Sequence, residues 1–205
     1  MKRPLSLVLG ILLIGVVVYF AYEYRADFGW GGEASRSGGA PKSESGEATW
    51  QPIDRSAEGF RVEMPEAATE TRIPAYTDRG VVEQVEMIEA TVDPDTTYAV
   101  AWADNPPVER AAGEDADKTL DMARDGALGR TQTSLVSESR NNHDGFRSRD
   151  FLARNAGGGV LNARLILAGT HLYMLMATFP DASGRREEDV NRFFDSFSLT
   201  GARQQ

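Results

Sequence analysis

Two apolar runs separated by a single tight turn constrain the fold of this chain most strongly. Residues 160–168 and 171–179 are rich in leucine, isoleucine and methionine, and only Gly169 and Thr170 lie between them. A two-residue connection that contains glycine is typical of a β-hairpin, because glycine readily adopts the backbone angles of such turns. The pattern predicts an antiparallel sheet with these two strands near its centre.

Shorter segments with alternating apolar residues predict further strands. Phe60, Val62 and Met64 share one face of a segment at 59–65, and Pro65 ends it. We expect the other strands at 81–92, 97–103, 134–139 and 146–154. A turn at Asp93-Pro94-Asp95 joins the first two of these into a hairpin.

Two segments have helical spacing of their apolar residues. The first covers 114–128, and Gly129 suits the position just after a helix. The second begins after Ser183, and its apolar face carries Val190, Phe193, Phe194 and Phe197. The order of elements predicts an α+β fold in which helices cover a mainly antiparallel sheet.

The N-terminal segment predicts a single-pass membrane anchor. No charged residue occurs in 4–22, and a helix of that length spans about 28 Å, close to the thickness of a bilayer core. Lys2 and Arg3 precede it, so residues 1–3 are expected in the cytoplasm and the rest of the chain outside the inner membrane, in the periplasm. A cleaved signal peptide is the alternative, but Tyr19 is bulky for the third position before a cut after Ala21.

Composition divides the remainder of the chain. Residues 23–49 consist largely of glycine, serine and charged residues, which predicts a disordered linker. Residues 50–200 carry the strand and helix patterns and form the predicted domain, and 201–205 are expected to be a disordered tail. The formal net charge of −9 makes nucleic acid an unsuitable partner.

Several short motifs recur in an order that resembles a known superfamily. They are Gly59-Phe60-Arg61-Val62-Glu63-Met64-Pro65, Tyr98-Ala99-Val100, Asp144-Gly145-Phe146, Gly169-Thr170-His171-Leu172-Tyr173-Met174-Leu175 with Pro180, and Asp189-Val190-Asn191-Arg192-Phe193-Phe194-Asp195-Ser196-Phe197. Together they resemble the PsbP-like α-β-α sandwich superfamily, and its membrane-anchored bacterial branch in particular. The superfamily includes the photosystem II extrinsic protein and a Ran-binding nuclear import factor. The resemblance implies a sandwich fold and docking onto a partner protein. It implies no catalytic motif, and no functional residue is carried over from it.

The residue types available for chemistry are few. The absence of cysteine excludes disulfides, a thiol nucleophile and thiolate metal sites. The two histidines, His143 and His171, are expected to be exposed turn residues, and neither belongs to a metal-binding motif. We therefore predict no cofactor, no metal and no catalytic residue.

Two groups of charged residues remain as candidates for binding. Asp115, Asp117, Asp121 and Asp125 form the acidic side of the predicted helix, which is expected to be solvated, with cation binding as the alternative. Arg147 and Arg149 point to the same side of one strand and form the candidate contact face for a carboxylate-bearing protein. An outward-facing, salt-bridged surface is the default interpretation of these arginines.

These features favour a non-catalytic protein-interaction module, tethered to the membrane through residues 4–22 and docking onto another envelope protein. A small-ligand-binding or sensory accessory domain is the second hypothesis, which requires a concave apolar pocket. A hydrolase is the third, which requires histidine, acidic or serine side chains gathered in a cleft.

Overall fold

The structure is a computed structural model that describes residues 48–201, except for 67, 77–81, 94–95 and 105–113. The predicted anchor at 4–22, residues 1–3, nearly all of the linker at 23–49 and most of the tail at 201–205 lie outside the described residues. The same holds for Pro94 and Asp95 of the predicted turn. Within the described ranges, no helix is long and apolar enough to cross a membrane.

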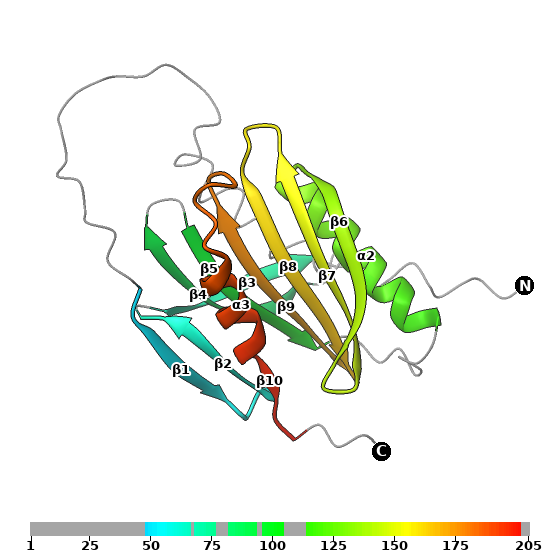
Figure 1. Ribbon diagram of the computed structural model, residues 1–205. Coiled ribbons are helices and arrows are strands. Elements are labelled where there is room, and N and C mark those ends of the chain that lie inside the picture. Colours follow the sequence, from blue (N-terminus) through cyan, green and yellow to red (C-terminus); the bar gives the residue numbers. More distant parts are fainter. Residues whose placement is uncertain (1–47, 67, 77–81, 94–95, 105–113, 202–205) are drawn as a thin grey trace, which may run out of the picture.

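The described strands and helices follow one another along the chain as Figure 1 shows. They are β1 (Trp50–Arg55), β2 (Phe60–Pro65), β3 (Thr69–Tyr76), β4 (Val82–Asp93), β5 (Thr96–Asp104), α2 (Glu114–Thr131), β6 (Thr133–His143), β7 (Phe146–Asn155), β8 (Val160–Ala168), β9 (His171–Phe179), α3 (Glu187–Ser196) and β10 (Ser198–Leu199). The strands form a seven-stranded antiparallel sheet of order β3-β4-β5-β9-β8-β7-β6 and a small sheet of order β1-β2-β10. The predicted α+β class with a mainly antiparallel sheet is confirmed for these residues.

The hairpin of β8 and β9 lies at the middle of the large sheet, as the sequence predicts. Ala168 pairs with His171, and Gly169 in the turn has a φ of 62°. Side chains on both faces of β8 are buried: Leu161, Leu165 and Leu167 belong to one core cluster, and Ile166 to the other. Because successive strand residues face opposite sides, a strand covered on both faces needs apolar residues at most of its positions, and in β8 only Asn162 and Arg164 are polar.

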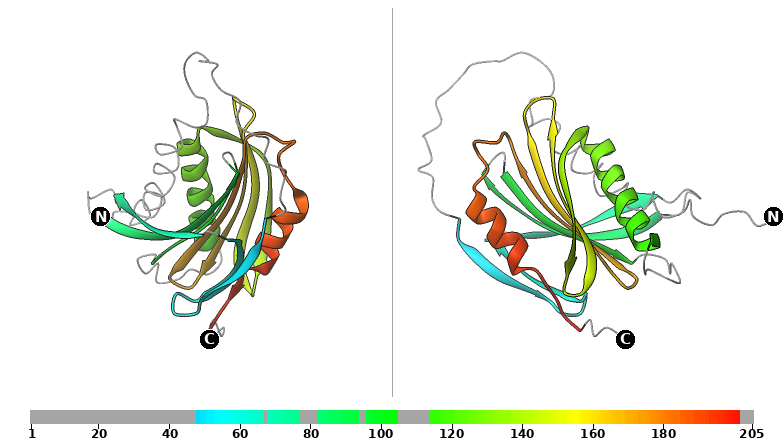
Figure 2. Two further views of the ribbon diagram at one scale, coloured as in Figure 1. Left: turned by 90° about the vertical axis from the view of Figure 1, so that its left-hand side faces the viewer. Right: turned by 45° about the vertical axis from the view of Figure 1, so that its right-hand side comes forward.

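Helices cover the two faces of the sheet from opposite sides, which Figure 2 shows in views along the sheet. Helix α2 packs on β6, β7 and β8, and it buries Leu120, Ala123 and Ala127 in its core cluster. Helix α3 and the small sheet cover the other face, where α3 packs against β2. The result is a helix–sheet–helix arrangement with two separate apolar cores.

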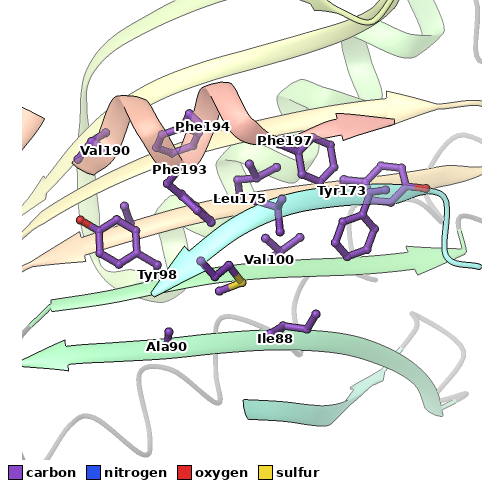
Figure 3. Close-up of a cluster of buried hydrophobic side chains, with 14 of the residues drawn as sticks. Ile88, Ala90, Tyr98, Val100, Tyr173, Leu175, Val190, Phe193, Phe194 and Phe197 are labelled. Carbon is purple, nitrogen blue, oxygen red and sulfur yellow. The ribbon is translucent and has the colours of Figure 1, made fainter. Parts of the chain in front are cut away.

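The core under α3 is aromatic (Figure 3). Phe193 is fully buried, and its ring centroid lies 5.4 Å from that of Tyr98 on β5. Phe60 of β2 stacks on Phe197, which directly follows α3, at a centroid distance of 5.4 Å. Aromatic rings carry the largest apolar areas of any side chains, so this cluster holds the helix and the small sheet onto the large one.

The end of α2 differs from the prediction. The helix continues through Gly129 to Thr131, and the Thr131 hydroxyl donates to the Ala127 carbonyl over 2.8 Å. Gln132, with a φ of 51°, takes the left-handed conformation that ends the helix. Gly129 was therefore wrong as the residue just after the helix, because Gln132 takes the left-handed conformation at that position instead.

Sequence reasoning did not predict β1, β3 or β10. Strand β10 has only two residues. Just after it, the Thr200 amide donates to the Gly59 carbonyl over 2.7 Å, which extends the pairing by one more hydrogen bond. Strand β1 combines polar residues with Ile53 and has no clear strand pattern of its own. Its extended conformation is stabilised by antiparallel pairing with β2. Strands of this kind depend on distant partners more than on their own residues.

Gly59 offers a sharp test of the small sheet. Its φ is +87°, and a Cβ there would lie 2.7 Å from the hydroxyl of Tyr173, which is buried and donates to the Glu58 carbonyl over 2.8 Å. We expect Gly59→Ala to lower the free energy of unfolding by more than the roughly 1–2 kcal/mol of a left-handed alanine alone. Gly158→Ala is the matched control, because Gly158 also has a positive φ, +95°, but nothing within 4 Å of the added atom. Urea unfolding of both variants measures the difference, and equal losses would contradict the steric argument.

Candidate functional site

Arg149 on β7 is the centre of a charged cluster between the sheet and α2. Its side chain is only 1% exposed. Its Nη2 donates to Asp117 Oδ1 over 2.6 Å, and its Nε donates to Asp121 Oδ1 over 3.1 Å. Glu138 Oε1 also lies 3.1 Å from Nε, as an ion pair without a hydrogen bond, since the single Nε proton is directed to Asp121. One guanidinium therefore faces three carboxylates.

The acidic partners come from two elements. Asp117 and Asp121 are four residues apart, so they occupy one side of α2. Glu138 stands on β6 opposite Phe151, whose side chain belongs to the core beneath α2. Arg124 of α2 completes the cluster: it pairs with Glu138 and, through Nη2, with Asp125 at 2.7 Å. The charges thus join α2, β6 and β7.

This cluster corrects two predictions made from the sequence. Arg149 does not belong to an outward contact face, because it is buried and donates to Asp117, to Asp121 and to the Ser148 carbonyl of its own chain. The acidic side of α2 is not merely solvated either, since Asp117 and Asp121 point to the arginines of β7. Arg147 does lie at the surface, with 45% of its side chain exposed, and donates to Asp117 Oδ2 over 2.7 Å. Its role as a contact residue stays a prediction.

Ion pairing changes the proton affinities in the cluster. The hydrogen bond from Arg149, followed by the charges of Arg149 and Arg147, holds the pKa of Asp117 below its usual value against the opposing effect of burial. Burial alone would lower the pKa of Arg149, but the bonds and charges of Asp117 and Asp121 outweigh it and raise that pKa. The pair of Asp117 and Arg149 is therefore charged at neutral pH and stabilises the packing of α2 on the sheet.

The lowered pKa of Asp117 predicts that acid weakens the fold. Its stabilisation is complete above the unfolded pKa of about 3.9 and is lost as pH falls through the lower folded pKa, because the unfolded state binds the proton more readily. Asp117→Asn has no proton to take up, so its free energy of unfolding should fall less than that of the wild type between about pH 5 and about pH 2. Urea unfolding across that range tests this, and parallel losses would contradict it.

A second arginine, Arg164, forms an ion pair on the opposite face of the sheet, beside α3. Arg164 of β8 binds both oxygens of Asp150 on β7, at 2.8 Å and 3.0 Å, and its Nη1 donates to the Phe194 carbonyl over 2.9 Å. Cations near the C-terminal carbonyls of a helix are favourable, because those groups carry partial negative charge. Arg164 therefore ties the end of α3 to the sheet.

The histidines contribute to structure. His143 is the last residue of β6, only 16% of its side chain is exposed, and its Nε2 lies 3.0 Å from the Phe197 carbonyl. The expectation of an exposed turn residue was wrong for His143, because the turn itself is Asp144-Gly145, where both φ angles are positive. His171 opens β9, as predicted. Across the part of the chain that the structure describes, no three His, Asp or Glu side chains are grouped so as to hold a metal ion.

The edge strand β6 is exposed along most of its length. This strand is at the end of the strand order and pairs with β7 alone in that sheet. A β-bulge between Leu135 and Ser137 interrupts its register, and the apolar side chains of Leu135 and Val136 are 41% and 53% exposed. The sequence segment 134–139 was predicted as a strand, but its exposure was missed. The signal was two adjacent apolar residues in an otherwise polar strand, where alternation would bury only one.

Neither a protein-family model nor a curated protein matches this sequence. Among solved structures, the chain is similar to cyanobacterial PsbP (CyanoP) from Synechocystis sp. PCC 6803, with 12% identity and a TM-score of 0.49 over 78% of this chain and 98% of that one. It is similar to the Ran-binding protein Mog1p from Saccharomyces cerevisiae, with 10% identity and a TM-score of 0.41 over 75% and 96% of the two chains. PA94 from Pseudomonas aeruginosa follows with 13% identity and a TM-score of 0.33 over 68% and 86%. A PsbP and a Ran-binding protein, the two kinds of relative expected from the sequence, are thus both among the structures that this chain resembles.

Proposed function

We propose that this domain is a non-catalytic protein-interaction module that docks through the free edge of β6. The carrying observation is the adjacent pair Leu135 and Val136, exposed by 41% and 53% on an edge strand. An edge strand offers unpaired amide and carbonyl groups to an extended chain, and neighbouring apolar side chains add contact area.

The chemistry around the edge also supports docking. Glu138 and Arg140 follow the apolar pair on the same strand, and Arg140 is 63% exposed. An apolar centre with charged residues beside it is the usual composition of a protein contact surface. The cluster around Arg149 supports the non-catalytic part of the proposal, because the charged groups that α2 and β7 bring together neutralise one another and hold the helix in place.

In this proposal residues 4–22 anchor the chain in the cell membrane, and residues 23–49 tether the domain on the extracytoplasmic side, within reach of an envelope protein. A reporter enzyme that is active only in the periplasm, fused to the C-terminus, tests the orientation. Activity is expected. An inactive but stably produced fusion would overturn the location and leave the docking edge unaffected.

Docking is tested by capture of the tagged full-length chain in mild detergent. Val136→Asp places a charge in the exposed pair and should remove the bound protein. Val92→Asp is the matched control, because Val92 of β4 is also an exposed valine, at 38%, but lies away from β6. Equal recovery of the same stoichiometric protein by both variants would overturn the β6 edge as the docking surface.

A further inference from the structure

We infer that the strand that takes up this edge is β6 of a second copy of the chain, antiparallel to the first and with the two-fold axis at Ser139. The inference rests on one part of the proposed function, the use of the β6 edge for docking, and it names the occupant of that edge. Pairing would join two seven-stranded sheets along β6, whose regular stretch after the bulge runs over residues 137–143. The register follows from the order of side chains on the strand.

The alternation of the strand limits where the axis can lie. A two-fold axis perpendicular to the sheet keeps the α2 face of both copies on the same side, so directly opposite residues must share a face. On β6, Glu138 and Arg140 face the α2 side, opposite Phe151 and Arg149, while Ser139 faces the α3 side, opposite Asp150. An axis midway between two residues would oppose residues of different faces. The axis therefore passes through a residue.

Charge then selects that residue. An axis at Glu138 or at Arg140 sets that side chain directly opposite its own copy, and like charges in that position are destabilising. An axis at Asn141 opposes Glu138 to Asp144 of the turn, another like pair, and an axis at Ser137 falls against the bulge. An axis at Asn142 or His143 would pair at most three residues of the regular stretch 137–143. An axis at Ser139 opposes Glu138 to Arg140 twice, once on each side. This is the register in which β6 is complementary to itself.

Arg140 is available for this pairing, whereas Glu138 is 17% exposed and already pairs with Arg124 and Arg149 of its own chain, so Arg140 of the second copy would join that cluster. Arg140 is 63% exposed and lies 3.6 Å from Asp121, so its guanidinium has room to turn toward a second chain. Ser139 and Asn141 are exposed on the other face, where the Asn141 amide donates to Ser139 Oγ over 3.1 Å. In the same register Val136 lies beside Asn142 of the second copy. The exposed apolar pair of each copy is then covered by the end of the opposing strand.

Single cysteines test this register directly, because the native chain contains none. Opposite residues in an antiparallel pair have Cα atoms roughly 4.5–5.5 Å apart, within the range that a disulfide bridges. The full-length chain is kept in mild detergent and oxidised mildly. Under these conditions we expect most of the Ser139→Cys variant to form a disulfide-linked dimer. Ser134→Cys and Asn142→Cys, exposed on the same strand but not opposite their copies, should remain mostly unlinked.

A charge change provides a second measurement. Arg140→Glu sets a glutamate opposite Glu138 on each side of the two-fold axis. The variant should therefore be a monomer, which light scattering measures. Arg154→Glu makes the same change on β7, one strand in from the edge, and should leave the dimer intact. Equal disulfide linkage of all three cysteine variants would overturn the inference. So would a wild-type chain that is monomeric by light scattering together with a Ser139→Cys variant that stays unlinked.

These outcomes separate the inference from the proposed function. If Val136→Asp releases a different protein while Ser139→Cys stays unlinked, the edge docks a foreign partner and the self-pairing is wrong. If Ser139→Cys links efficiently and no other protein depends on Val136, self-pairing stands and docking onto an envelope protein is wrong.

Discussion

Replacing Arg149 by methionine is expected to lower the free energy of unfolding by about 1–3 kcal/mol. The change removes the most buried guanidinium beside Asp117, Asp121 and Glu138, while the other arginines around the cluster still pair with these carboxylates. The loss is large for an ion pair because the hydrogen bonds of a buried charge are not replaced by water. Urea unfolding at neutral pH, followed by tryptophan fluorescence, measures the loss.

Arg147→Met is the matched control for this experiment. Arg147 stands two residues away on the same strand and pairs with the same Asp117, but 45% of its side chain is exposed. An exposed pair contributes little, so the expected loss is at most about 1 kcal/mol. Similar losses in the two variants would show that burial of Arg149 is not what makes the cluster important.

Phe193→Ala is expected to cost about 3–5 kcal/mol, because it removes a fully buried ring and leaves a cavity between α3 and the large sheet. The ring touches Tyr98 on β5 and Phe194 on its own helix, so its loss weakens the contact of α3 with the sheet (Figure 3). Urea unfolding again gives the magnitude, and protection of α3 amides from hydrogen exchange should fall in parallel.

The control for the phenylalanine is Asn191→Ala, an exposed position on the same helix. Surface substitutions away from caps and ion pairs change stability by no more than about 0.5 kcal/mol. A small loss for Phe193→Ala, close to that of the control, would mean that the small sheet and α3 are held by other contacts.

The strands with strong local signals were predicted closely. The bounds of β8 and β9 match the predicted 160–168 and 171–179, because their apolar runs and the Gly169-Thr170 turn need no information from elsewhere. The face of α3 was also predicted, since the spacing of Val190, Phe193 and Phe194 has one helical solution. Strands β1, β3 and β10 escaped prediction because their pairing partners, and not their own residues, define them.

The candidate site shows the same division. Both halves of the charged cluster were visible in the sequence, as acidic residues at helical spacing in α2 and as alternating arginines in β7. Each half taken alone was assigned to the solvent or to a foreign protein. Sequence spacing shows which side of an element a residue occupies, but it does not show which element packs against that side.

The residues of this chain thus determine the strands that have an apolar pattern of their own, the Gly169-Thr170 turn and the apolar faces of the helices. The tertiary structure alone decided that Asp117 and Asp121 meet Arg149. It also decided that β6 ends the sheet with Leu135 and Val136 exposed. The reason is physical. Periodicity depends on residues that are close neighbours in the sequence, whereas burial, ion pairing and edge position depend on other segments, brought together only when the sheet forms. Asp117, for example, lies 32 residues before Arg149.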